Sequence, residues 1–209
     1  MGDLSFDVML SEEQIVANWE KYCGLLLQTG EHRTEQIQAL LDHLGDRLVM
    51  CPASSKRDYH NCFVGGLVDH SLRVLKNCTR LMKVSPDVFG GIPEESVVFA
   101  ALLHDLGKVG DLENDRYLPQ TSDYYRSKGN LFEHNHKVVL TNTHASLFLL
   151  QHFGVQMTYD EFEAILLNDG SATDDGRMYC MKETVLTLLI QQSDRLACKQ
   201  EKCLRQSST

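Results

Sequence analysis

Residues 93–108 read PEESVVFAALLHDLGK and join a helix start, an apolar run and a charged end. Proline followed by two glutamates is typical of a first helical turn, because proline lacks only an N–H that has no partner there and acidic side chains favour the helix dipole. The apolar run 97–103 predicts a helix that is buried on all sides. His104 and Asp105 end this run. Burying a carboxylate beside an imidazole is costly unless a cation or hydrogen bonds compensate, so the pair indicates either a metal site or a helix end whose polar side chains face solvent.

The rest of the chain repeats apolar residues at the helical period and holds only four prolines, which predicts an all-α fold. Ser11 to Gln14 form a capping-box start, so we expect a first helix over about 11–27. A third helix should begin near Gly65 and Gly66. Further helices are expected over about 141–153, 159–167 and 182–200, with a polar loop over 168–177 and frayed residues at the end. The second helix should end before Pro52, with one apolar face made of Ile37, Leu40, Leu41, Leu44 and Leu48.

The stretch 111–136 differs from its surroundings because it is polar and holds a Lys128-Gly129-Asn130 turn. We interpret it as a hairpin or an ordered lid inserted between helices. Its tyrosines are Tyr117, Tyr124 and Tyr125. They could stack on a nucleobase, or they could form a small satellite core under the hairpin.

Length and charge narrow the classes of protein. The 209 residues suit one domain, at roughly 150 residues per domain, with a helical part over 1–50, a core over 51–200 and the insert at about 111–136. The net charge of −9 makes non-specific binding to nucleic acid or to an anionic membrane unfavourable. A small phosphorylated ligand remains compatible, because it needs only a few well-placed cations.

The apolar runs and the cysteines predict a cytoplasmic protein. The longest apolar run spans seven residues, whereas a transmembrane helix needs about 20, and the first residues lack the basic and apolar regions of a signal peptide. Seven scattered cysteines indicate reduced thiols. Cys198 and Cys203 could alternatively form a metal or redox pair.

Three more positions extend the His104–Asp105 pair. His70 lies near the start of an amphipathic helix, His144 opens a later helix, and Asp194 lies in a mostly apolar stretch of the last helix. Each alone is more often a satisfied structural group. Together with His104 and Asp105 they form a plausible mixed nitrogen and oxygen site for a divalent metal.

Residues 65–71 (GGLVDHS), 101–108 (ALLHDLGK) and 193–195 (SDR) together resemble the HD-domain superfamily of metal-dependent phosphohydrolases. The resemblance covers about 51–197. The segment from Cys51 through His60 to Gly66 is similar to the branch found in bacteria and their phages, which would place a phage-encoded protein in the host cytoplasm. The family implies a helical bundle in which His70, His104, Asp105 and Asp194 bind a divalent metal, with His144 where two-metal members place another histidine.

The resemblance also implies a second histidine cluster in two-metal members, and here that region reads Leu166-Leu167-Asn168-Asp169-Gly170. Asp169 could bind metal instead, or it could belong to a simple turn. We therefore expect one metal per chain. The donor set suits Mn²⁺, Co²⁺, Fe²⁺, Ni²⁺, Zn²⁺ or Mg²⁺ without choosing among them.

The chemistry of such a site assigns roles to nearby residues. A metal-activated water would attack phosphorus, with Asp105 helping to orient the water. Lys108, one turn after His104, and Arg73, one turn after His70, are the first candidates to hold the phosphate. His60 could donate a proton to the leaving group. Lys56, Arg57 and Arg195 are further candidates for binding the substrate.

We therefore predict a metal-dependent phosphohydrolase that acts on a nucleotide or a related small phosphate ester. One alternative is a nuclease that cuts single-stranded nucleic acid from the 3′ end. The other is a regulatory domain that binds a nucleotide without turnover. The apolar faces of the first two helices could also pack between subunits of a homo-oligomer.

Overall fold

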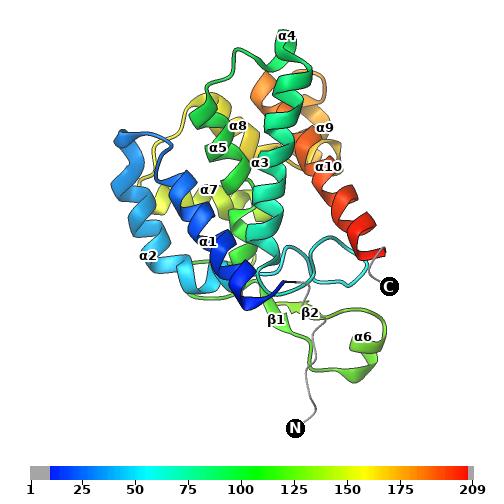
Figure 1. The fold of residues 1–209 in the computed structure, drawn as a ribbon. Coiled ribbons are helices and arrows are strands. Elements are labelled where there is room, and N and C mark those ends of the chain that lie inside the picture. Colours follow the sequence, from blue (N-terminus) through cyan, green and yellow to red (C-terminus); the bar gives the residue numbers. More distant parts are fainter. Residues whose placement is uncertain (1–9, 207–209) are drawn as a thin grey trace.

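The computed structural model of the chain describes residues 10–206. Its centre is helix α5 (Glu94–Leu103), whose apolar run 97–103 is buried except for the half-buried Val98, as that run predicts. Helices α1 (Glu12–Leu26), α3 (Gly66–Val84), α8 (Tyr159–Leu166) and α10 (Val185–Gln206) all contact α5 and enclose it (Figure 1). The all-α fold class is thereby confirmed, with one small two-stranded sheet added to the helices.

The first helices cover one side of α5. Ser11 caps α1 with both hydrogen bonds of the expected capping box. The short 3-10 helix η1 (Glu31–Arg33) leads into α2 (Thr34–Met50), whose apolar face is buried as expected. The Tyr22 hydroxyl donates to the Leu102 carbonyl at 2.9 Å and ties α1 to α5. Arg33 and Glu161 form a buried ion pair at 2.8 Å, which joins η1 to α8.

Helices α3 and α10 pack side by side and both contact α5 (Figure 1). Their shared core includes Val74 and Cys78 of α3 and Leu186, Leu189 and Ile190 of α10. This packing matters for the site, because it brings residues near the start of α3 against residues in the second half of α10.

The insert projects from one end of the bundle (Figure 1). Strands β1 (Tyr117–Pro119) and β2 (Phe132–His134) pair antiparallel, with Tyr117 opposite His134, and α6 (Asp123–Ser127) lies between them. The insert docks on the loop before α3, because the Leu131 N–H donates to the Ser55 carbonyl at 3.0 Å. The expected hairpin is therefore present, with a helical turn in its connection.

The remaining elements complete the bundle and differ in places from expectation. The 3-10 helix η2 (Leu106–Val109) follows α5, and α7 (Asn142–His152) and α8 lie within about a residue of the expected bounds. The short α4 (Pro86–Phe89) is an addition. The expected loop over 168–177 is wrong: it contains η3 (Gly170–Ala172) and most of α9 (Asp174–Tyr179), because Thr173 caps α9 by accepting from the Gly176 N–H.

The last helix also has different bounds. It starts at Val185, later than expected. The Thr184 hydroxyl accepts from the Thr187 N–H, a capping contact that sets the start of the helix. It continues to Gln206, past the expected end near residue 200, so the expected fraying is wrong for residues 201–206, while residues 207–209 lie outside the described residues. Among the described helices, none is long and apolar enough to cross a bilayer.

Candidate metal centre

His104 and Asp105 stand where α5 gives way to η2. His104 keeps helical backbone angles, with φ −54° and ψ −35°, whereas Asp105 leaves the helix with φ −110° and ψ 13°. His104 is 0% exposed and Asp105 is 6% exposed. The alternative of a polar helix end facing solvent is therefore wrong, and both side chains need partners inside the protein.

A close contact between η2 and α7 fixes this turn. A Cβ atom on Gly107 would lie 2.0 Å from the Asn142 carbonyl oxygen, so only glycine allows the two elements to approach this closely. The Gly107 N–H donates to Ser146 Oγ at 2.7 Å. The Asn168 side-chain amide donates to the His104 carbonyl at 2.8 Å. These contacts hold the backbone that carries His104.

The His104 ring has one nitrogen that is satisfied and one that is not. Nδ1 lies 2.9 Å from the Ala101 carbonyl, an arrangement in which Nδ1 carries the proton and donates. Nε2 is buried and makes no hydrogen bond with the described residues. A buried imidazole nitrogen with a free lone pair is the arrangement that a metal ligand requires.

The His70 ring shows the same division. Its Nδ1 lies 3.0 Å from Oε1 of Glu201, a carboxylate that is 4% exposed on α10. Its Nε2 lies 3.1 Å from Oδ1 of Asp194 and 3.6 Å from Oδ2 of Asp105, and it too lacks a hydrogen bond of good geometry. A carboxylate that accepts from one imidazole nitrogen typically orients the other toward a metal.

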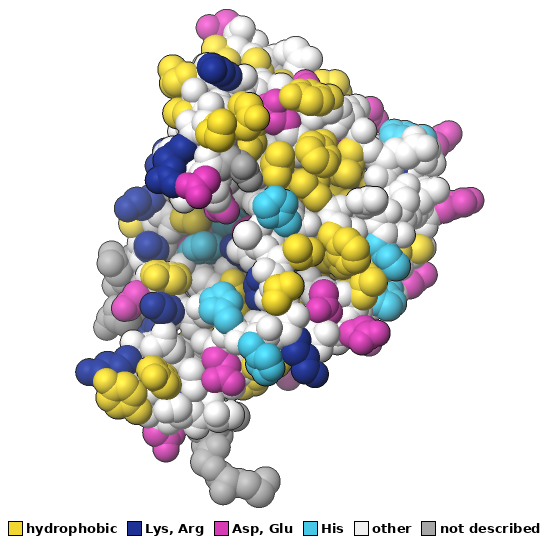
Figure 2. All heavy atoms as spheres, turned by 180° about the vertical axis from the view of Figure 1, so that it is seen from behind, with side chains coloured by type: hydrophobic (Ala, Val, Ile, Leu, Met, Phe, Trp, Pro, Cys, Tyr) yellow, Lys and Arg dark blue, Asp and Glu magenta, His cyan; other side chains and the backbone are white. Residues whose placement is uncertain are grey.

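These side chains converge on one point. Donor atoms of His70, His104 and Asp105 all lie within 4.8 Å of one another, and Asp194 adds a carboxylate beside His70. Two imidazoles and two carboxylates form a donor set that suits a divalent metal, and each Nε2 atom lies beside a carboxylate, at 3.1 Å for His70 and Asp194 and at 3.3 Å for His104 and Asp105. The face in Figure 2 is hollowed, with histidine and charged side chains in and around the hollow.

Charge near the centre keeps both carboxylates ionised. Burial alone would raise the pKa of Asp105, but Lys108 and His104 outweigh it and hold that pKa well below its usual value. Burial likewise raises the pKa of Asp194, and His70 outweighs it, which leaves a pKa of about 2. Both groups are therefore carboxylates at neutral pH and can bind a cation.

Lys108 and His60 lie beside the cluster. Lys108 Nζ is 2.6 Å from Asp105 Oδ2 and 3.3 Å from His60 Nε2. Burial lowers the pKa of Lys108, but Asp105 outweighs it and raises the pKa above its usual value. Burial and the positive charge of Lys108 lower the pKa of His60 to about 2, so His60 is neutral and accepts a hydrogen bond from Lys108.

Arg73 is not a free cation for the phosphate, because two carboxylates already contact it. Its guanidinium lies 3.0 Å from the carboxylate of Asp69 and 3.3 Å from that of Glu201. Since Glu201 also contacts His70, Arg73 belongs to the network that holds this histidine. We therefore expect Arg73 to hold Glu201, which in turn positions His70.

The other candidate residues are exposed at the surface. Lys56 and Arg57 are exposed on the loop that contacts the insert, and Arg195 is exposed on α10. His144 is exposed at the start of α7, where Nδ1 lies 2.8 Å from Thr141 Oγ1, and it is not among the clustered donors. The structure thus does not bring His144 together with the other four proposed ligands.

Asp169 lies near enough to the centre to sense its charges. Its pKa is raised by partial burial and by the neighbouring carboxylates of Asp105 and Asp194. A negative side chain facing two others would favour an additional cation. Asp169 remains a candidate ligand on this basis.

The sequence interpretation missed Glu201, and it considered Cys198 only as a partner of Cys203. The Cys198 thiol donates to Asp194 Oδ1 at 3.5 Å, and its sulfur belongs to a second group of close donors with His60 and His70. Asp194, Cys198 and Glu201 are spaced four and seven residues apart and so share one helix face. That spacing is the signal that could have revealed them.

The central helix of this all-helical bundle ends in a buried His–Asp pair. A histidine and a carboxylate from two flanking helices complete the cluster. This arrangement defines a class of metal-binding protein. Residues 67–198 match the family described as HD domain, and the chain belongs to this family. The match includes His70, His104, Asp105 and Asp194, whereas His60 and Glu201 lie outside it. The chain matches no curated protein and no solved structure.

Proposed function

We propose that this protein is a metal-dependent phosphohydrolase that acts on a nucleotide or a related small phosphate ester. The observation that carries the proposal is the convergence of two buried imidazole nitrogens with two ionised carboxylates. Membership of the HD domain family supports metal-dependent hydrolysis in general. The ligands we propose are His70, His104, Asp105 and Asp194, for one divalent ion per chain.

The proposed chemistry assigns a task to each nearby group. A divalent metal bound here would supply an activated water and would polarise a phosphoryl oxygen. The carboxylate of Asp105 orients the attacking water, whose oxygen forms a bond to phosphorus as the bond to the leaving oxygen breaks. The leaving oxygen takes up a proton, so the products are an alcohol and a phosphate.

Lys108 is the chain's own cation at this point. Lys108 is 6% exposed, and its charged ammonium group is held against Asp105. An ammonium in a site of low polarity stabilises the negative charge that builds up on the phosphoryl oxygens. We assign Lys108 to the phosphate, and we assign neutral His60 to a hydrogen bond with either Lys108 or the leaving group.

The test is a product screen of the purified protein with Mn²⁺, Co²⁺ or Mg²⁺. The panel contains nucleoside mono-, di- and triphosphates, cyclic nucleotides, ribose 5-phosphate and one labelled oligonucleotide. We expect hydrolysis of one small phosphate ester, complete loss in His104→Ala, and unchanged activity in His152→Ala, which removes an exposed histidine of α7.

Two other outcomes would replace the proposal. Release of mononucleotides from the oligonucleotide alone would favour the nuclease. Bound metal with no hydrolysis of any compound would favour a regulatory domain. Full activity in His104→Ala would show that the centre does not carry out the reaction.

A further inference from the structure

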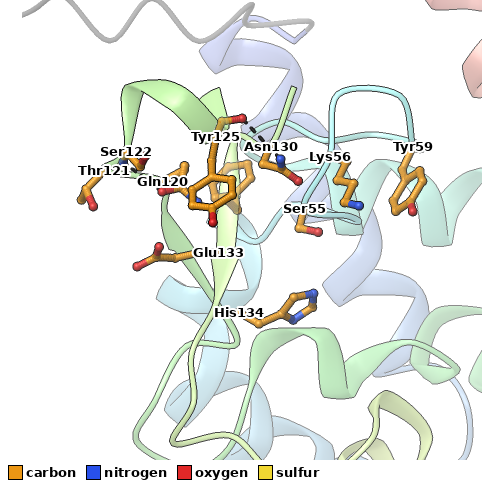
Figure 3. A pocket seen from close by; sticks show the side chains of 11 residues that line it. Ser55, Lys56, Tyr59, Gln120, Thr121, Ser122, Tyr125, Asn130, Glu133 and His134 are labelled. Atoms are coloured by element: carbon orange, nitrogen blue, oxygen red, sulfur yellow. Dashed lines mark hydrogen bonds between the residues drawn. The ribbon is translucent and has the colours of Figure 1, made fainter. Parts of the chain in front are cut away.

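A pocket outside the metal centre lies between the insert and the loop before α3 (Figure 3). Its volume is about 810 Å³, which is within the usual range for small-molecule sites. The residues that bear on its chemistry are Ser55, Lys56, Tyr59, Gln120, Tyr125 and Asn130. It is thus lined from two segments that are far apart in the sequence.

Backbone hydrogen bonds hold the two walls together. The Ser55 carbonyl accepts from the N–H groups of Leu131 and Phe132 at 3.0 and 3.1 Å. The Arg57 N–H donates to the Gly129 carbonyl at 2.7 Å. The pocket is therefore preformed, which lowers the entropic cost of binding a ligand.

Two side-chain amides line the pocket, and each uses only one of its two polar groups in a hydrogen bond with the described residues. Gln120 Oε1 accepts from the Ser122 N–H at 2.9 Å, and no hydrogen bond from its NH₂ group reaches another described residue. Asn130 Nδ2 donates to the Tyr125 carbonyl at 3.3 Å, and its Oδ1 accepts none from the described part of the chain. The pocket thereby offers one oriented donor and one oriented acceptor, the two kinds of group that the edge of a nucleobase can pair with.

Aromatic surface accompanies these amides. The Tyr125 side chain lies in the middle of the pocket and is 54% exposed, while Tyr59 stands on the opposite wall (Figure 3). Exposed aromatic rings stack favourably on nucleobases. Tyr124 does not line the pocket, but its ring packs edge-on against that of Tyr125, with the ring centroids 5.3 Å apart.

The charges of the pocket favour a neutral ligand group. Lys56 brings a positive charge and Glu133 a negative one. Burial, Arg116 and Lys56 lower the pKa of His134, so its ring is neutral at pH 7. A phosphate chain would meet the carboxylate of Glu133, whereas an uncharged heterocycle would not be repelled.

The pocket adjoins the metal centre. Tyr59 lines the pocket, and the next residue, His60, lies with its Nε2 3.3 Å from Lys108 Nζ. On the insert side, the His134 ring lies 5.2 Å from the ring of Tyr117, and the charge of Lys108 acts on Tyr117. The pocket and the centre are thus joined through adjacent residues of one loop.

We propose that this pocket binds the base of a nucleotide whose phosphate lies at the metal centre. The position of the phosphate rests on the proposed function, whereas the binding of the base does not. Tyr125 stacks on the ring, and Gln120 and Asn130 read its edge.

The first test measures binding of adenosine, guanosine, cytidine and uridine by ligand-observed NMR, with the metal removed by EDTA. We expect at least one nucleoside to bind, and Tyr125→Ala to weaken that binding by about tenfold. Gln120→Ala should change which nucleoside binds best. Tyr159→Ala, which removes an exposed tyrosine of α8, is the matched control and should bind like the wild type. Binding by none of the four, or equal binding in Tyr125→Ala, would overturn the proposal.

A second test separates the pocket from the reaction. It compares kcat/KM for a nucleoside 5′-monophosphate and for ribose 5-phosphate, which lacks only the base. We expect Tyr125→Ala to lower the value for the nucleotide by about tenfold and to leave that for ribose 5-phosphate unchanged. Equal losses on both substrates would refute the base site and leave the hydrolase intact. Nucleoside binding without any hydrolysis would support the base site and refute the proposed function.

Discussion

Nε2 of His70 on α3 lies 3.1 Å from Oδ1 of Asp194 on α10, and neither helix could place its residue there alone. The contact depends on the packing of α3 against α10 around the buried helix α5. The candidate metal centre therefore depends on the packing of the whole bundle. Substitutions of its residues need separate measurements of metal binding and of folding.

Asp194→Ala should lower metal affinity by more than about 100-fold, because it removes a proposed ligand. Mutation of a residue that only hydrogen-bonds to a metal ligand already lowers the affinity by about 10–100-fold. The measurement is a competition titration against a metal-binding dye. Arg195→Ala, which changes the exposed neighbouring residue, serves as the control and should match the wild type. Wild-type affinity in Asp194→Ala would remove this residue from the ligand set.

Glu201→Gln should lower metal affinity by about 10-fold while the protein stays folded. The reason is that Glu201 accepts from Nδ1 of His70 and thereby orients its Nε2. The same titration, with circular dichroism to check the fold, measures the effect, and Lys199→Ala on the exposed face of α10 is the control. If Glu201→Gln binds metal as tightly as the wild type, the carboxylate has no part in positioning His70.

Metal binding should release one proton at neutral pH. Burial lowers the pKa of His70, but Glu201 and Asp194 outweigh it and raise the pKa to about 10 in the metal-free protein. His70 is therefore protonated at pH 7 and must lose the proton at Nε2 to bind a metal, whereas the carboxylates are already ionised. Apparent affinity should rise by about tenfold per pH unit between pH 6 and 9.

Calorimetric titrations in buffers of different ionisation enthalpy measure that proton directly. A binding enthalpy that does not depend on the buffer, together with an affinity that does not change with pH, would contradict the assignment of His70 as a ligand.

Glu161→Ala should destabilise the protein by about 3–5 kcal/mol, because it leaves the charge of Arg33 buried and without its partner. Urea denaturation measures the change in the free energy of unfolding. Asp123→Ala removes the partner of an exposed ion pair with Arg126 and should have little effect. Equal stability of Glu161→Ala and the wild type would show that the buried pair does not hold η1 against α8.

The helices that could be predicted are those with strong local signals. The capping box at Ser11 and the apolar run after Pro93 are properties of adjacent residues, and both helices lie where expected. The short helix α9 was missed because Thr173 and Gly176 also suit a loop. Its formation depends on a single capping contact that composition does not indicate.

The residues of the site likewise fall into those with a local sequence signal and those without one. His70, His104, Asp105 and Asp194 could be proposed from their motifs, and the structure brings them together. Glu201 could not be singled out, because one glutamate on a helix with many charged residues carries no signal until α3 is packed beside it. The pocket of the insert depends on how the hairpin docks on residues 51–65, which no local pattern specifies.

The central claim is that the His–Asp centre hydrolyses a phosphate ester with a bound metal. The most direct measurement is the rate of phosphate release from the best compound of the panel, for protein stripped with EDTA and then restored with Mn²⁺, in the wild type and in His104→Ala. The account predicts no release from the stripped protein, full recovery of the wild type on adding Mn²⁺, and no recovery of His104→Ala. Release that persists without metal, or that Mn²⁺ restores equally in His104→Ala, would contradict it.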